Sequence, residues 1–413
     1  MRATPAPEPP RPSTPGGRAG SVAMVVSTLA LVFVGVSMIH TLDRGARRPS
    51  ASDRPAAAGA TDAEAPVIGG SPGSLRVEPR LLEQPAGHVG LDACDRFPLQ
   101  WVFPGMTAEQ AVGELREGGL TVNALAEVGE ATCDASGCVV VPIVSVVEHI
   151  PATVRQRLYA VLGRHPENPT LGQPYRRPLS FGTWSNAPGL SMRARQLLHN
   201  LTWRQGDHEW FADEPLVCHA LTDPGDRLRM LEVLRTRYGL SATLDIAPGA
   251  DVAPLRRWWS RGSSVEAVDA RLEEARRSPT GGLPVRDLLP PFPRTRLDTF
   301  PRADEPGYDC FWTALHFFDP NPPTDLPGTE GFAARLAADY VEVPMESMAF
   351  GDMLVFHDAS GAPMHAMNFV GDNVVFTKNG GSHRRPWLFQ TIDEVRLDYT
   401  HAASLRAYRR RPS

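Results

Sequence analysis

Between residues 19 and 42 the chain carries no Asp, Glu, Lys or Arg, and this apolar segment constrains its architecture more than any other feature. Val22 to Ile39 is an almost unbroken apolar run, long enough with its small flanking residues to cross a bilayer as one helix. A buried core helix is a poor alternative, because a Pro-rich tail precedes the run and an Ala-, Pro- and Arg-rich tract follows it. A cleaved signal peptide is the main rival, but no clear small-x-small cleavage site adjoins the run. We therefore expect a transmembrane helix at 21–42.

The composition on either side of this segment divides the rest of the chain. Residues 1–20 are rich in Pro, Arg, Gly and Ser and predict a disordered tail, and residues 43–75 predict a flexible linker. Residues 76–300 have the pattern of a mixed α/β region to which no motif assigns a role. Residues 301–413 have the order of a helix-then-sheet α+β domain. With 42 basic against 47 acidic residues, the net charge of −5 gives no case for a nucleic-acid partner.

The cysteines bear on the side of the membrane that the C-terminal part occupies. Cys133 and Cys138 flank a short hairpin tip that a disulfide can close, which leaves Cys94 and Cys218 as a possible long-range pair and Cys310 as the remaining thiol. The alternative is that all five are reduced and buried. The C-x4-C spacing without a second close pair is poor for structural zinc, and no metal site is expected. Two disulfides would place the C-terminal part in the extracytoplasmic, periplasmic compartment.

Local patterns predict several elements in residues 76–300. Thr107 to Gln110 forms a capping box for a helix that ends at Gly118-Gly119. A β-branched run at 138–147 predicts a strand broken by Pro142. Two further helices are expected at 226–238 and 265–277.

Two segments of residues 301–413 carry recognisable chemistry. Cys310 follows a loop and opens an apolar helix expected at 310–318, so its thiol meets the positive end of the helix dipole, which favours thiolate. His365 lies 55 residues later, at the start of a buried strand expected at 365–370. An imidazole beside this thiol would complete a nucleophile–base pair. A second helix at 329–340 and strands at 352–357 and 373–378 complete the expected order.

This C-terminal part, about a quarter of the chain, resembles the NlpC-type cysteine peptidases, the bacterial cell-wall branch of the papain-like superfamily. Asp309-Cys310 is similar to the Asp-Cys pair that opens the family's helix, and Phe350 to Phe356 resembles its Gly-Asp-led strand. His365 stands where the family places its base, and residues 374–379 occupy the place of the strand with the third, orienting polar residue. The resemblance implies a papain-like fold in which the cysteine helix packs on an antiparallel sheet.

The sequence departs from the family pattern at two places. Phe311 and Trp312 stand where small residues usually follow the nucleophile. The third polar residue, typically a histidine about twelve positions beyond the base, is replaced by Thr377, followed by Lys378 and Asn379. Asn379 is our choice, because an amide oxygen can accept a hydrogen bond from an imidazole N–H and a lysine cannot.

The predicted function is a membrane-anchored, extracytoplasmic cysteine hydrolase that cleaves amide bonds, with cell-wall peptides as the substrate that the resemblance implies. Cys310 is the expected nucleophile, His365 the base and Asn379 its orienter. The backbone N–H of Cys310, with Tyr308 and Asp309 in support, is expected to stabilise the oxyanion.

No cofactor is expected, and the lipid bilayer is the expected partner of residues 21–42. The oligomeric state is not set by the sequence. Two other interpretations stay open. One is an acyltransferase or thioesterase on the same fold, and the other is a non-catalytic envelope scaffold in which residues 76–300 bind a partner or glycan.

Overall fold

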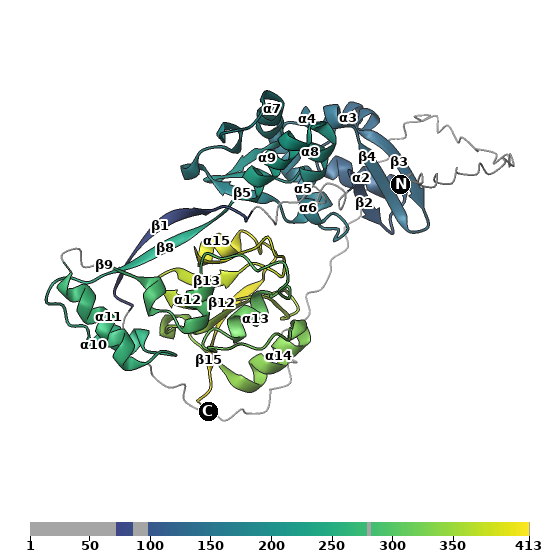
Figure 1. Cartoon of the computed structure of the whole chain (residues 1–413). Helices are drawn as coiled ribbons and strands as arrows, with labels where there is room; N and C mark the ends of the chain where they lie inside the picture. Colours follow the sequence, from purple (N-terminus) through teal and green to yellow (C-terminus); the bar gives the residue numbers. More distant parts are fainter. Residues whose placement is uncertain (1–71, 86–97, 279–281, 413) are drawn as a thin grey trace, which may run out of the picture. The chain divides into compact units, whose positions relative to one another are not determined.

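The computed structural model describes residues 72–85, 98–278 and 282–412 (Figure 1). Over these ranges the chain has a mixed α+β fold built on antiparallel sheets, which confirms that part of the predicted fold class.

The predicted tail at 1–20 and transmembrane helix at 21–42 lie outside the described residues, as do Cys94 and nearly all of the linker predicted at 43–75. Within the described ranges, no helix combines the length and the apolar character that a membrane crossing requires.

One sheet, with nine strands in the described part of the chain, organises the C-terminal half of the fold. In sheet order its strands are β1 (Ser74–Leu82), β8 (Arg237–Asp245), β14 (Trp387–Thr391), β13 (Val374–Lys378), β12 (Pro363–Gly371), β11 (Met353–His357), β15 (Ser404–Arg410) and β10 (Tyr340–Val343), and β9 (Gly282–Pro284) pairs with β8. Because β1, β8 and β9 precede residue 300, the boundary predicted between 300 and 301 does not coincide with an edge of this sheet.

The helices on this sheet bury its apolar side chains. Figure 1 shows α13 (Cys310–Leu315) lying across β12 and β13, with α14 (Gly328–Asp339) beside it. The remaining helices of this half are α10 (Ala253–Trp259), α11 (Val265–Arg277), α12 (Pro291–Arg296) and α15 (Ile392–Arg396). Trp258 in α10 donates its indole N–H to the carbonyl oxygen of Val370 in β12 at 3.1 Å, and Trp259 packs against Phe350 with ring centroids 5.0 Å apart. Burial of large aromatic side chains is the main stabilising contribution here.

Residues 101–235 pack around an apolar cluster of their own. Their strands form two small antiparallel sheets in the order β2-β4-β3 and β5-β7-β6. The strands are β2 (Trp101–Pro104), β3 (Gly129–Asp134), β4 (Gly137–Pro142), β5 (Tyr175–Pro178), β6 (Trp203–Gln205) and β7 (His208–Phe211). The helices are α2 (Ala108–Glu117), α3 (Val122–Glu127), α4 (Val144–Glu148), α5 (Ala152–Leu162), α6 (Pro169–Gly172), α7 (Met192–Leu201), α8 (Glu214–Ala220) and α9 (Pro224–Arg235).

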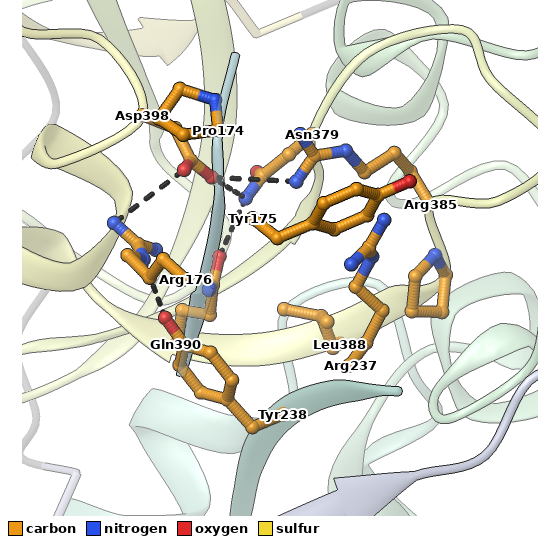
Figure 2. A pocket seen from close by; sticks show the side chains of 11 residues that line it. Pro174, Tyr175, Arg176, Arg237, Tyr238, Asn379, Arg385, Leu388, Gln390 and Asp398 are labelled. Carbon is orange, nitrogen blue, oxygen red and sulfur yellow. Dashed lines mark hydrogen bonds and ion pairs between the residues drawn. The ribbon is translucent and has the colours of Figure 1, made fainter. Parts of the chain in front are cut away.

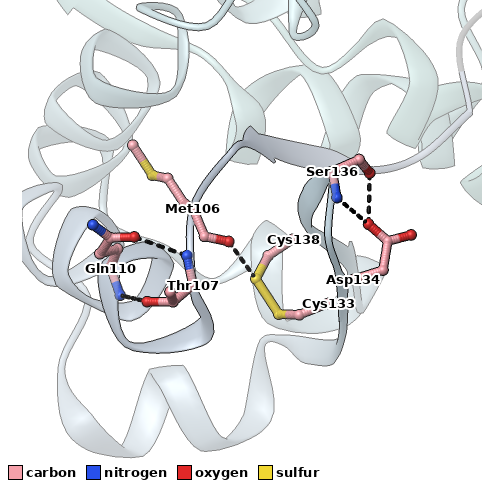
Figure 3. The surroundings of a disulfide bond; sticks show 7 residues. All are labelled: Met106, Thr107, Gln110, Cys133, Asp134, Ser136 and Cys138. Carbon is pink, nitrogen blue, oxygen red and sulfur yellow. Dashed lines mark hydrogen bonds between the residues drawn. A yellow bond between two sulfur atoms is a disulfide. The ribbon is translucent and has the colours of Figure 1, made fainter.

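A disulfide closes the β3–β4 hairpin, as predicted (Figure 3). Cys133 and Cys138 are direct cross-strand partners, which brings their Cα atoms within 4.1 Å. The turn is held by Asp134, whose carboxylate accepts hydrogen bonds from the backbone N–H and the hydroxyl of Ser136. Cys218 is also disulfide-bonded, but its predicted partner Cys94 lies outside the described residues. Cys310 is a free thiol, as predicted.

Several predicted elements are confirmed at their predicted bounds. The capping box of Thr107 and Gln110 is present at the start of α2, which ends at Gly118. The helix at 265–277 is α11, and the strand ended by Pro142 is β4.

Other predicted elements end earlier than their sequence patterns indicate. The helix expected to reach residue 238 ends at Arg235, because Tyr238 belongs to β8, which pairs with β1. The run after Pro142 continues as the short helix α4, and the helix of Cys310 ends at Leu315 instead of residue 318.

Candidate functional site

The start of α13 fixes the position of Cys310. Asp309 is the N-cap, and its carboxylate accepts a hydrogen bond from the backbone N–H of Trp312 at 2.8 Å. Tyr308 stacks on the indole ring of Trp312 with ring centroids 3.8 Å apart. Both residues proposed from the sequence as supports therefore hold the helix start in place, Asp309 as a cap and Tyr308 as a packing partner.

The sulfur of Cys310 lies beside the base strand. It accepts a hydrogen bond from the backbone N–H of Ala366, the residue that follows His365. Burial raises the pKa of the Cys310 thiol to about 12, and the nearby Asp309 carboxylate raises it further, while the Ala366 N–H lowers it. The prediction of a thiolate is therefore wrong for this structure, because desolvation of the charged form outweighs a helix of only one and a half turns.

His365 lies at the start of β12 and is fully buried. Its imidazole is stacked on the ring of Tyr399 with centroids 4.2 Å apart, and Phe356 is a second ring neighbour at 6.3 Å. Burial lowers the pKa of His365 to about 3, against a weak opposing effect of Asp398. The imidazole is therefore neutral at physiological pH.

A chain of hydrogen bonds fixes the tautomer of His365. Its Nε2 lies 3.0 Å from the hydroxyl of Thr377, and that hydroxyl donates to the side-chain oxygen of Asn379, also at 3.0 Å. Because the Thr377 proton is used by Asn379, Thr377 accepts from Nε2–H, and the lone pair of the imidazole is on Nδ1. The Nδ1 atom is buried and has no hydrogen-bond partner, so no hydrogen bond joins it to Cys310 in this structure.

Asn379 does not contact the imidazole directly. Its amide nitrogen donates to Gln390 at 2.8 Å and to Asp398 at 3.0 Å. The residue in contact with His365 is Thr377, which the sequence analysis considered but did not choose. A register shift between Phe369 and Gly371 puts Val375 opposite Phe369, so Thr377, two positions further on, shares a sheet face with His365.

Asp398 connects this chain to residues 101–235, which the sequence analysis left without a role. Figure 2 shows its carboxylate among Arg176 from β5, Arg385 and Asn379. Its oxygens lie 3.5 Å from Arg176 and 3.8 Å from Arg385. Burial acts to raise the pKa of Asp398, but Arg176, Arg385 and other cations outweigh it and hold the pKa below its ordinary value. Sequence spacing carries no signal for a pair so far apart along the chain.

Lys378 is buried on the opposite sheet face from Thr377, with no exposed surface. Its ammonium donates to the carbonyl oxygens of Gly380 at 2.7 Å and Ser382 at 3.1 Å, and lies over the ring of Trp387. Burial lowers the pKa of Lys378 to about 7, while Cys310 and Asp309 act to raise it. Lys378 thus holds the loop that follows Asn379 against the sheet.

Two cavities adjoin this network. The one drawn in Figure 2, between Arg176, Arg237 and Asp398, holds only about 30 Å³, enough for a water molecule or two. The other holds about 340 Å³, and its walls include Asn379, Asp398 and Tyr399. Only the second is large enough for part of a substrate.

The described residues contain no group of three or more His, Cys, Asp and Glu side chains close enough to hold a metal ion. Comparisons of the chain with protein-family profiles, with curated proteins and with solved structures found no match.

The arrangement contains the parts of a nucleophile–base pair in an inactive protonation state. The thiol and the imidazole are both neutral and buried, and the Nδ1 lone pair faces no donor. Proton transfer from sulfur to nitrogen requires the two atoms to approach and the thiolate to be solvated or paired. Such a change is the kind that substrate binding produces at a closed site.

Proposed function

We propose that the chain is a cysteine hydrolase that cleaves amide bonds, with an NlpC-like, papain-like arrangement of its C-terminal part. The observation that carries the proposal is the hydrogen bond from Ala366 to the Cys310 sulfur, immediately beside a histidine whose Nδ1 is the free lone pair. Cysteine, base strand and orienting polar residues come together from segments that are 55 or more residues apart along the chain.

In the proposed reaction, the Cys310 sulfur attacks the amide carbonyl while Nδ1 of His365 takes the thiol proton. The tetrahedral intermediate collapses with transfer of that proton to the leaving amine, which leaves an acyl-thioester on Cys310. Water then attacks the thioester, His365 takes the proton of that water, and the thiol is restored as the acid product leaves. Thr377 holds the imidazole through Nε2, and Asn379 supports Thr377 from behind.

The proposed substrate class is a cell-wall peptide, supported by the resemblance of residues 301–413 to NlpC-type peptidases. We also propose that residues 21–42 anchor the chain in the membrane with the described part outside the cytoplasm. The Cys133–Cys138 and Cys218 disulfides support an oxidising compartment. Full-length protein should stay with membranes through carbonate extraction, whereas a fragment starting at residue 72 should be soluble. Release of unprocessed full-length protein by carbonate would contradict the anchor.

A non-catalytic scaffold is the second candidate, and the burial of both reactive groups favours it. Hydrolysis of purified muropeptides by the full chain separates the two. Cys310→Ala and His365→Ala should each abolish release of free amine, and Thr377→Val should reduce it more than Asn379→Ala, because only Thr377 contacts the imidazole. Absence of hydrolysis by the wild-type chain on muropeptides and on generic peptide amides would leave the scaffold as the better reading.

Alkylation of Cys310 tests the site without any substrate. With the thiol pKa near 12, labelling by iodoacetamide should be slow at pH 7 and should rise steadily up to pH 10. Tyr399→Ala should speed labelling, because that ring covers His365, while Tyr399→Phe keeps the ring and should label like the wild type. Fast labelling with a plateau near pH 7 would mean that the thiolate already exists in solution.

A further inference from the structure

The cavity of about 340 Å³ has a lining that points to a specific kind of ligand. Apolar faces come from aromatic rings on both sides, among them Tyr159, Trp203 and Trp210 from residues 101–235 and Tyr399 from the C-terminal part. Trp203 and Trp210 are stacked nearly parallel, with an angle of 16° between their planes. Flat rings of this kind offer broad apolar surfaces at low entropy cost.

Three amide side chains share the lining with these rings. Gln156 comes from α5, Gln173 follows α6, and Gln205 ends β6. In the described residues none of the three side-chain amides has a hydrogen-bond partner within the protein, and Gln173 and Gln205 are exposed. Each amide offers both donors and an acceptor.

The charges of the lining exclude a strongly charged ligand. Arg385 and Asp398 are its only Asp, Glu, Lys or Arg side chains, and they form an ion pair with each other. The ligand that fits is therefore neutral, has flat apolar faces, and carries groups on its rim that both donate and accept hydrogen bonds. An aromatic peptide side chain meets only the second condition, whereas a pyranose ring with hydroxyl and acetamido groups meets all three.

We propose that this cavity is a binding site for a neutral N-acetylated sugar. Asn379, Asp398 and Tyr399 form one of its walls and also stand behind or over His365. A sugar in the cavity thus lies next to the Cys310–His365 centre. If the proposed hydrolase activity holds, on which this step rests, the substrate is a glycopeptide whose sugar occupies the cavity while its peptide reaches Cys310.

Binding of a β-1,4-linked N-acetylglucosamine tetramer to the full chain in detergent tests the site directly. We expect saturable binding, seen by calorimetry and as a change in tryptophan emission. Gln156→Ala, Gln173→Ala and Gln205→Ala should each raise the Kd about three- to tenfold, the range for one lost hydrogen bond. Gln100→Ala removes an amide that is not part of the lining and should leave the Kd unchanged.

Absence of saturable binding, or an equal Kd in the wild type and all three lining variants, overturns the assignment. So does binding of N-acetyl-phenylalanine amide in place of the sugar, which would make the cavity a pocket for an aromatic side chain. Cys310→Ala should bind the sugar like the wild type. Sugar binding without muropeptide hydrolysis would remove the proposed activity alone, and equal hydrolysis of peptides with and without sugar, with no sugar binding, would remove the cavity assignment alone.

Discussion

At the scale of single residues, the sequence identified the reactive pair but not its protonation state. Cys310 and His365 were identified from their positions at a helix start and a strand start, and both stand there in the structure. The thiolate was inferred from the helix dipole, a local effect. The raised pKa comes from desolvation, which depends on every group packed around the sulfur. No local pattern in the chain reports that environment.

Burial of His365 makes a prediction for stability against pH. Its pKa falls from an ordinary 6.5 to about 3 in the folded chain. Between these values the unfolded chain binds a proton that the folded chain does not, so this contribution is fully present above pH 6.5 and is lost as the pH falls. At about 1.4 kcal/mol per pH unit, the loss from pH 7.5 to pH 5 is about 2 kcal/mol.

Urea unfolding at these two pH values measures the effect. His365→Phe keeps a ring between Tyr399 and Phe356 but cannot titrate, so its stability should depend less on pH by about that 2 kcal/mol. His401→Phe removes an exposed histidine and should keep the wild-type dependence. An unchanged pH dependence in His365→Phe would show that His365 is not buried and neutral in solution.

At the scale of elements, one bulge decides which polar side chain holds the base. A two-residue turn at Gly371-Asp372 with regular pairing puts Val374 opposite Phe369, and Lys378 then shares a face with His365. The shift between Phe369 and Gly371 pairs Phe369 with Val375 instead and moves Thr377 to that face. Strand existence was predictable from the β-branched and aromatic runs, but a one-residue shift leaves no mark in such a pattern.

The Arg176–Asp398 pair joins two elements, β5 and the segment after α15, and a double-mutant cycle tests its role. Arg176→Met leaves Asp398 with fewer cations and should cost about 3 kcal/mol of unfolding free energy. Asp398→Asn should cost a similar amount. The double variant should cost clearly less than the sum, because no unpaired buried charge is left.

Denaturant unfolding of the four proteins gives the coupling energy, and the exposed pair Arg406–Glu342 provides a control. Both of its side chains are about half exposed, at 47% and 57%, so Arg406→Met should cost under about 1 kcal/mol. If the Arg176 and Asp398 costs simply add, the two residues do not act as a pair. Muropeptide hydrolysis by Arg176→Met, if reduced without loss of folding, would further place Arg176 behind His365.

At the scale of the whole molecule, the sequence predicted the α+β class but not the reach of the main sheet. Helix-then-strand order in residues 301–413 was readable from local periodicity. The partnership of β1 with β8 was not, because it joins segments more than 150 residues apart and their sequences fix no register. β14 and β15 were also missed, although both are short apolar or alternating runs that could have been assigned as strands.

The sheet therefore predicts how fragments of the chain behave. A fragment of residues 301–413 lacks β1, β8 and β9 and the helices α10 to α12. It exposes the apolar groups that Trp258, Trp259 and Phe292 cover, among them Phe350, Phe369 and Phe376. It also exposes the edge of β14 that contacts β8, and an uncovered apolar edge strand favours aggregation.

We expect residues 301–413 alone to bind an apolar dye, to elute as aggregates and to lack a cooperative urea transition. Residues 72–413 should elute as a single species and unfold cooperatively, because the cover of the sheet is then complete. Addition of the missing residues 72–300 as a separate chain should not rescue the short fragment, since β8 and α12 lie on either side of the same sheet through covalent connections. A soluble 301–413 fragment with a cooperative transition would show that the predicted boundary at residue 300 is a real domain boundary.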